Sequence, residues 1–140
     1  MKFNADILNE YWTDIYFHLH YSHNEKITHQ VVRILQLVEK KDNIGIKEIA
    51  SFLNVSHNTA SEHVKRIIDK KYLMKKRDKI DERKVILELT PLGREVLYRN
   101  SSLDRAKLNE ILKGMSTEEK ELLESALRLL KERAKNVHSC

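Results

Sequence analysis

Apolar residues recur at three- and four-residue intervals through most of this chain, and few residues interrupt the pattern. Near the start they fall at Ile7, Leu8, Tyr11, Ile15 and Leu19, as one face of an amphipathic helix requires. The 140 residues include three glycines and one proline, so long helices joined by short turns are expected. This length is enough for one ordinary domain with a hydrophobic core. We therefore expect a mainly α-helical domain.

The periodicity and the capping residues predict about six helices and one small β-hairpin. The helices are expected at residues 6–21, 28–41, 47–53, 56–70, 91–112 and 117–135, and the two strands at residues 72–77 and 84–90. A very short strand is expected at residues 44–46, and the helix over 91–112 is expected to be irregular near residues 100–102. Ser116 and Glu119 have the spacing of a capping box at the start of the last helix.

The excess positive charge lies in one stretch. The net charge is +5, and the 29 residues from 56 to 84 contain ten Lys or Arg and five Asp or Glu, so they account for all of it. A local basic patch is typical of proteins that bind a polyanion. A solvated charged face is an equally good reading of the charge alone.

The same stretch contains a short helix, a tight turn and a second helix capped by Ser56. This order predicts a helix-turn-helix, whose second helix enters the major groove of DNA with its first residues at the base edges. Removing the positions expected to be buried leaves a groove-facing set: His57, Asn58, Ser61, Glu62 and Lys65. Asn can pair with adenine, Glu with cytosine and Lys with guanine. Thr59 and Arg66 are better placed for phosphate contacts, and Ser56 at the start of the helix also belongs to the expected DNA-binding set.

The hairpin that follows has a recognisable pattern: Asp78, Asp81-Glu82-Arg83, an apolar strand, then Leu89-Thr90-Pro91-Leu92-Gly93. With Ser56 and Thr59 at the start of the preceding helix, the segment resembles the MarR family of winged-helix regulators. The resemblance implies a winged helix-turn-helix flanked by N- and C-terminal dimerisation helices.

The resemblance also implies roles for residues of the hairpin, or wing. Arg83 is expected to enter the minor groove, with Asp81 orienting it through a carboxylate–guanidinium pair. Lys76 and Arg77 lie on a strand that is basic in the family, and they complete the expected DNA-binding set. Family members usually have Gly where this chain has Lys71, so Lys71 must adopt a left-handed conformation unless the turn differs.

The family is homodimeric, through its first helix and its last two. We expect one domain over residues 1–140, with a DNA-binding part at about 28–93 and a helical dimerisation part at about 5–27 and 94–137. The apolar candidates for the dimer interface are Leu103, Leu108, Ile111, Leu112, Leu123, Leu127 and Leu130. A dimer would bind a pseudo-palindromic operator.

Aromatic and histidine side chains gather in the first two helices. Family members often bind a small effector near this region, and the candidates here are Tyr11, Trp12, Tyr16 and His20. These side chains are also ordinary packing groups. A zinc-responsive regulator of the same fold is an alternative, but the histidines have no recognisable ligand spacing and no cysteine is near them. We therefore expect no metal site and no cofactor.

The expected function is that of a DNA-binding transcriptional regulator. The resemblance favours a repressor, because the family leans towards repression. No phosphate-binding glycine loop or catalytic triad pattern is present, so an enzyme is not expected. A winged-helix module that binds protein instead of DNA is the other alternative. The one cysteine, Cys140, allows no internal disulfide, and no apolar run is long enough to span a membrane. We expect a cytoplasmic protein.

Overall fold

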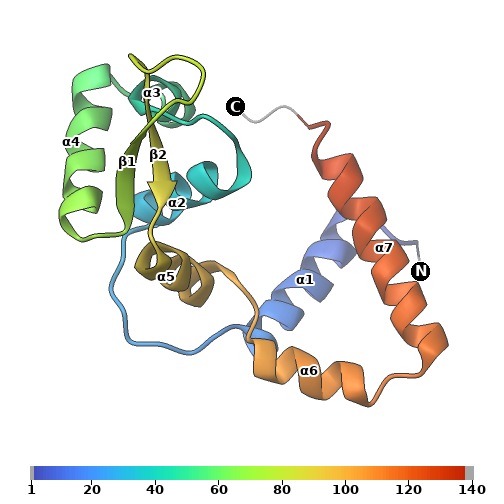
Figure 1. Ribbon diagram of the computed structural model, residues 1–140. Helices are drawn as coiled ribbons and strands as arrows, with labels where there is room; N and C mark the ends of the chain where they lie inside the picture. Colours follow the sequence, from blue (N-terminus) through green and yellow to red (C-terminus); the bar gives the residue numbers. More distant parts are fainter. Residues whose placement is uncertain (1, 138–140) are drawn as a thin grey trace. The chain divides into compact units, whose positions relative to one another are not determined.

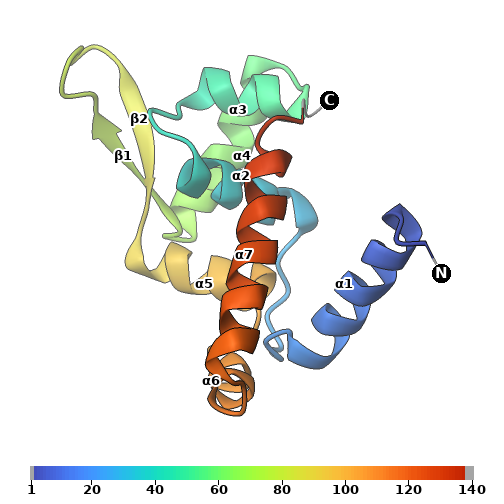
Figure 2. The same cartoon turned by 90° about the vertical axis from the view of Figure 1, so that its right-hand side faces the viewer.

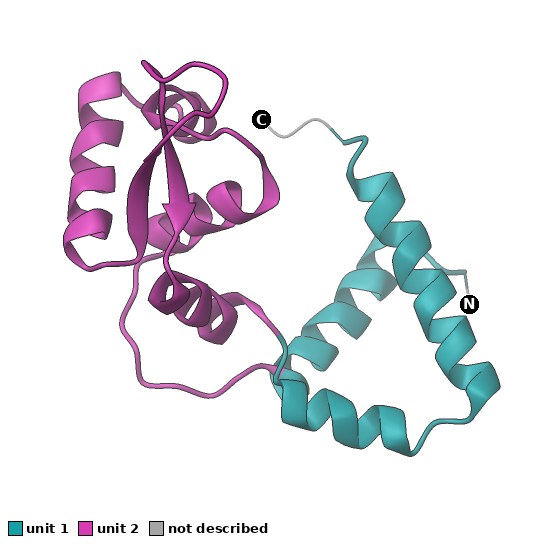
Figure 3. Ribbon diagram, viewed as in Figure 1, with its two compact units in different colours: residues 1–19, 103–140 teal, residues 20–102 magenta. Residues whose placement is uncertain are grey.

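The computed structural model describes residues 2–137 and divides the chain into two compact units. One is the winged-helix unit, residues 20–102, and the other is the helical unit, formed by residues 1–19 and 103–140 (Figure 3). The winged-helix unit therefore extends beyond the expected 28–93 at both ends. Cys140 lies outside the described residues.

The winged-helix unit contains four helices and one hairpin in the predicted order (Figure 1). They are α2 (His29–Lys40), α3 (Ile46–Leu53), α4 (His57–Asp69), β1 (Leu73–Arg77), β2 (Val85–Leu89) and α5 (Pro91–Ser101). The strands are antiparallel, with Leu73 opposite Leu89 and Arg77 opposite Val85. The loop that joins them extends outward from the helices (Figure 2). The expected fold class, mainly α-helical with a small wing, is confirmed.

A single apolar core holds these elements together. Its largest fully buried side chains come from α2, α3, α4 and β1: Ile34, Leu35, Ile49, Val64, Ile67 and Leu73. Each such side chain contributes about 1.5–3 kcal/mol relative to an exposed one. The core fixes the orientation of α4, because Ala60, Val64 and Ile67 bury one face of that helix.

The predicted strand at residues 44–46 is wrong. Ile44 accepts one hydrogen bond, from the Leu87 N–H at 2.7 Å, but Ile46 already begins α3. The N–H of Gly45 is bound by the Glu48 carboxylate at 2.6 Å, as part of the start of that helix. The extended segment is therefore too short for a ladder, although it lies beside β2.

The connection from α4 to the hairpin has the left-handed residue that the sequence predicts. Lys71 has φ 67°, which costs a residue with a side chain about 1–2 kcal/mol relative to glycine. Its carbonyl accepts the Thr90 hydroxyl at 2.5 Å, and Thr90 in turn accepts the Gly93 N–H at 2.9 Å. An added Cβ on Gly93 would lie 2.0 Å from the Tyr72 carbonyl oxygen. The Leu-Thr-x-x-Gly sequence thus joins the start of α5 to the end of α4.

Arg99 links the segment before α2 to α5 within the winged-helix unit. Its guanidinium pairs with Glu25, far away in the sequence, and with Glu95 at 2.7 Å. Burial disfavours the charged form of Arg99, but the hydrogen bonds and charges of Glu25 and Glu95 outweigh it and raise its pKa. The extended segment before α2 is therefore held to α5 by one ion pair, Arg99 with Glu25, and Glu95 holds the same guanidinium from within α5.

The helical unit consists of α1 (Ala5–Leu19), α6 (Arg105–Lys113) and α7 (Thr117–Ala134). One predicted helix over 91–112 is wrong: α5 ends at Ser101, and Asp104 begins α6 by accepting the Ala106 N–H at 2.9 Å. Seven helices therefore occur among residues 2–137. No residue of α1, α6 or α7 is buried. The predicted capping box of Ser116 and Glu119 is present. Within residues 2–137, no helix has the length and apolar character that crossing a bilayer requires.

Candidate nucleic-acid interface

The turn between α3 and α4 is tight and fixed by its own hydrogen bonds. Asn54 adopts the left-handed conformation, with φ 56°, and ends α3. The Ser56 hydroxyl then accepts the Thr59 N–H at 3.1 Å and caps α4. This leaves the first N–H groups of α4 at an exposed helix end, where they favour a phosphate.

The predicted groove-facing residues share one exposed side of α4. His57, Asn58, Glu62 and Lys65 are exposed, and Ser61 is half-buried. The spacing of 58, 61, 62 and 65 places these positions on adjacent turns of one face. Arg66 is exposed and lies 3.9 Å from Glu62, a surface contact that contributes little to stability. The face is therefore accessible and carries both donors and acceptors.

The wing presents Arg83 at its tip. The Arg83 side chain is 93% exposed, and the Asp81 carboxylate accepts both its Nε–H at 3.3 Å and its backbone N–H at 3.1 Å. The Asp78 N–H donates to the Lys84 carbonyl at 2.9 Å and closes the loop. These contacts orient an exposed guanidinium on an ordered loop.

The two strand residues that complete the predicted set have partners within the wing. Arg77 donates to the Glu82 carbonyl at 2.8 Å, so it supports the loop. Lys76 lies 3.5 Å from the Glu88 carboxylate, on the neighbouring strand. Both side chains are exposed, so a phosphate can still compete for them.

A basic groove lies between the start of α3, the start of α4 and the wing. Its volume is about 540 Å³, and its lining residues are Gly45, Ile46, Lys47, Glu48, His57, Lys75, Arg83, Lys84, Val85 and Leu87. Lys47, Lys75 and Lys84 were not in the predicted set. The hydrogen bond between Leu87 and Ile44 holds the start of α3 beside β2, and the lining residue Lys47 lies at that start.

The predicted effector residues belong to the N-terminal region. Tyr11, Trp12 and Tyr16 lie on α1 and are 54%, 50% and 42% exposed, and His20 follows that helix. Among residues 2–137, no three side chains of His, Cys, Asp or Glu come together as metal ligands would.

A capped helix after a tight turn, with an ordered basic hairpin beside it, defines the winged helix-turn-helix class. Residues 20–100 match the model of a family described as transcriptional regulator SarA/Rot, and this match covers more than half of the chain. The chain belongs to the SarA/Rot family of transcriptional regulators. The prediction of a winged-helix regulator that is not an enzyme is therefore confirmed.

Relatives and solved structures agree with this assignment. The chain is 23% identical over 113 residues to YdgJ of Bacillus subtilis, an uncharacterized HTH-type transcriptional regulator, and the match covers 81% of this chain and 69% of YdgJ. A MarR-like transcriptional regulator from Thermotoga maritima has a TM-score of 0.68 and 17% identity over 97% of this chain and 100% of its own.

Two further structures share the fold. FabT of Streptococcus pneumoniae, solved in complex with DNA, has a TM-score of 0.58 and 23% identity over 96% of this chain and 100% of its own. MepR of S. aureus, solved with ethidium bromide, has a TM-score of 0.61 and 18% identity over 94% and 97%. The expected resemblance to MarR-type winged-helix proteins is confirmed at the level of the fold.

Proposed function

We propose that this regulator binds duplex DNA sequence-specifically, with α4 in the major groove and Arg83 in the adjacent minor groove. The observation that carries the proposal is the pairing of an exposed polar face on α4 with an oriented, 93% exposed guanidinium on the wing. Asn58, Glu62 and Lys65 have the chemistry to read base edges. A guanidinium suits a narrow minor groove, where the negative potential is strongest.

Phosphate contacts complete the proposed interface. Thr59, Arg66, Lys76 and the lysines of the basic groove would hold the sugar–phosphate backbone, which positions the protein without specifying sequence. His57 and Ser61 lie beside the base-reading residues on α4. A regulator held in this way on an operator blocks access to it, so we propose repression.

Selection of bound duplexes from a random pool tests this proposal. The expected result is an enriched motif of two inverted half-sites whose centres lie about one helical turn apart. Recovery of unenriched sequences, or of no DNA at all, would contradict sequence-specific binding.

Asn58→Ala is expected to relax the preference at one base pair of each half-site and to cost about 1–3 kcal/mol on the selected sequence. The reason is that a bidentate contact to one base is lost while the phosphate contacts remain. Duplex titrations with single-base variants measure it. Asn109→Ala removes the same side chain from the exposed surface of α6 and should leave every affinity unchanged. An equal loss on all sequences would assign Asn58 to the backbone instead.

We also propose that the chain acts as a homodimer through the helical unit. Apolar side chains on α6 and α7 are exposed, among them Ile111, Leu112, Leu123, Leu127 and Leu130, and no residue of α1, α6 or α7 is buried. Large exposed apolar patches mark interaction sites. A second copy would cover this surface and place two α4 helices on one operator.

Leu127→Glu is expected to convert the dimer to a monomer, because a carboxylate would be buried without a partner in the interface. Leu123, Leu127 and Leu130 recur on one stripe of α7, and Leu127 is 51% exposed in the single chain. Sedimentation at micromolar concentration measures the change in mass. Ser125→Glu adds the same charge to the opposite side of α7 and should leave the mass unchanged. A dimeric Leu127→Glu variant would exclude this stripe.

An effector is proposed to act through the aromatic side chains of α1. Tyr11, Trp12 and Tyr16 are accessible, and His20 is close to them in sequence. The structure of MepR with ethidium bromide is an example of an aromatic ligand on a protein of this fold. Trp12 is the only tryptophan, so its fluorescence would report an aromatic ligand that binds beside it.

A further inference from the structure

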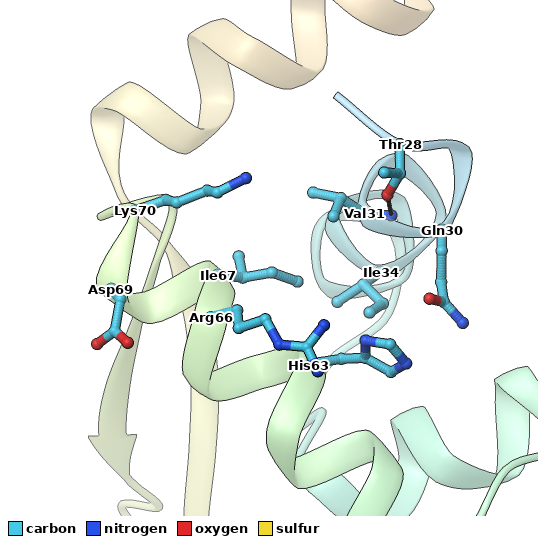
Figure 4. Close-up of a pocket in the computed structure, with 9 residues that line it drawn as sticks. All are labelled: Thr28, Gln30, Val31, Ile34, His63, Arg66, Ile67, Asp69 and Lys70. Carbon is cyan, nitrogen blue, oxygen red and sulfur yellow. Dashed lines mark hydrogen bonds between the residues drawn. The ribbon is translucent and has the colours of Figure 1, made fainter. Parts of the chain in front are cut away.

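The loop of the wing carries an apolar side chain that the protein itself leaves uncovered. Ile80 is 97% exposed, the highest fraction among the large apolar side chains of residues 2–137. Elsewhere the winged-helix unit covers such groups: Ile34 and Ile67 face one another in the cleft between α2 and α4 (Figure 4), and both are fully buried. A side chain that buries almost no area adds almost nothing to the stability of the fold.

The loop that presents Ile80 is held by its own hydrogen bonds and extends outward from the helices (Figure 2). The Asp78 carboxylate accepts the Ile80 N–H at 3.0 Å, and the Asp78 N–H donates to the Lys84 carbonyl at 2.9 Å. The Arg77 guanidinium donates to the Glu82 carbonyl at 2.8 Å, which ties the other side of the loop to β1. Because the backbone is fixed on both sides of Ile80, little entropy is lost when its side chain binds a partner.

A single exposed apolar residue is common on protein surfaces, so the position of Ile80 decides what it can bind. Ile80 precedes Arg83 by three positions, so their Cα atoms lie at most about 11 Å apart, the length of about three base-pair steps. Residues 78–84 contain three basic and three acidic side chains, so the loop has no net charge. Charge attraction alone therefore holds this loop on DNA weakly, and an apolar contact beside Arg83 would strengthen it.

We propose that Ile80 is an apolar wedge that enters the minor groove beside Arg83 and partly unstacks one base-pair step, which kinks the duplex. The proposal rests on the proposed function, in which the wing lies in the minor groove. Isoleucine is among the side chains that insert between base pairs, and such wedges kink duplexes by about 20–90°. Pyrimidine–purine steps such as TA unstack most easily. Ile80 thereby makes the sequence under the wing part of the specificity, without a hydrogen bond to any base.

The bend of the selected duplex tests the wedge. The duplex carries a fluorescent donor at one end and an acceptor at the other, and energy transfer reports its bend when the full chain is saturating. The wild type should bend it by at least about 20°. Ile80→Ala should remove most of this bend and weaken the affinity about tenfold, because most of the apolar contact is lost. Ile80→Leu keeps an apolar side chain of the same volume and should retain both the bend and the affinity.

Ile80→Lys separates the wedge from charge attraction. The added positive charge should make binding at low salt tighter than that of Ile80→Ala, while the bend should be lost in both variants. Leu92→Ala removes an exposed apolar side chain from α5, outside the basic groove, and should change neither the bend nor the affinity. A wild-type bend with Ile80→Lys, or an equal loss of bend with Leu92→Ala, would contradict the wedge.

Base substitutions under the wing test the discrimination. A stiff A-tract in place of a TA step should weaken wild-type binding by about fivefold more than it weakens Ile80→Ala binding, because only the wild type unstacks the step. A straight duplex with the wild type, or equal bend and affinity with Ile80→Ala, would overturn the wedge while the proposed function stands, and would leave Ile80 to a protein partner. Failure of the wild type to bind any duplex would instead contradict the proposed function, and the wedge with it.

Discussion

Gly93→Ala is expected to lower the free energy of unfolding of the winged-helix unit by about 3 kcal/mol, the upper end of overpacking costs. The new Cβ would lie 2.0 Å from the Tyr72 carbonyl oxygen and 2.9 Å from its carbonyl carbon. These are backbone atoms, so no side-chain rotation relieves the overlap. The start of α5 would have to move away from the end of α4. Urea unfolding followed by circular dichroism measures the loss.

Gly114→Ala is the matched control for this substitution. Gly114 has φ −83°, and its added Cβ would meet only the Ile111 carbonyl oxygen at 3.6 Å, an ordinary contact. The change should leave stability equal or raise it by about 0.4–1 kcal/mol, because alanine restricts the unfolded chain. If both variants lose stability equally, the close approach at Gly93 is not the cause.

Arg83→Ala is expected to weaken binding of the selected duplex by about 10- to 100-fold, while the base preferences read by α4 stay unchanged. The guanidinium is exposed at the wing tip and oriented by Asp81, so its removal deletes the minor-groove contact without disturbing the core. Fluorescence anisotropy with the selected duplex measures the affinity, and single-base variants measure the preferences.

Two variants distinguish position from charge. Asp81→Asn keeps Arg83 but weakens the pair that orients it, so a smaller loss of affinity is expected. Arg133→Ala removes an equal charge from the last turn of α7 and should have almost no effect at physiological salt. If Arg133→Ala weakens binding as much as Arg83→Ala does, the wing has no special role.

Local signals in the sequence predicted most helix starts correctly. Thr28, Ser56, Thr90 and Ser116 each accept a backbone N–H three residues later, so their capping depends only on neighbouring residues. The left-handed conformation of Lys71 was also predictable, because the turn it occupies demands it.

The features that were missed depend on distant parts of the chain. The irregularity expected near residues 100–102 is a full break between α5 and α6. That break is set by Asp104, whose side chain caps α6 and whose N–H donates to the Leu19 carbonyl at 2.7 Å. The pairing of Arg99 with Glu25 joins residues 74 positions apart. Periodicity within one helix carries no information on such contacts, and for the same reason Lys47 was not predicted to lie beside the wing.

The salt dependence of duplex binding tests the central claim most directly. If α4 and the wing hold the DNA backbone, the logarithm of the affinity should fall linearly with the logarithm of salt concentration as counterions are released. With about six phosphate contacts, the affinity should drop by about a thousandfold between roughly 50 and 200 mM salt. Salt-insensitive binding, or no duplex binding at low salt, would contradict this account and favour a winged-helix module that binds protein.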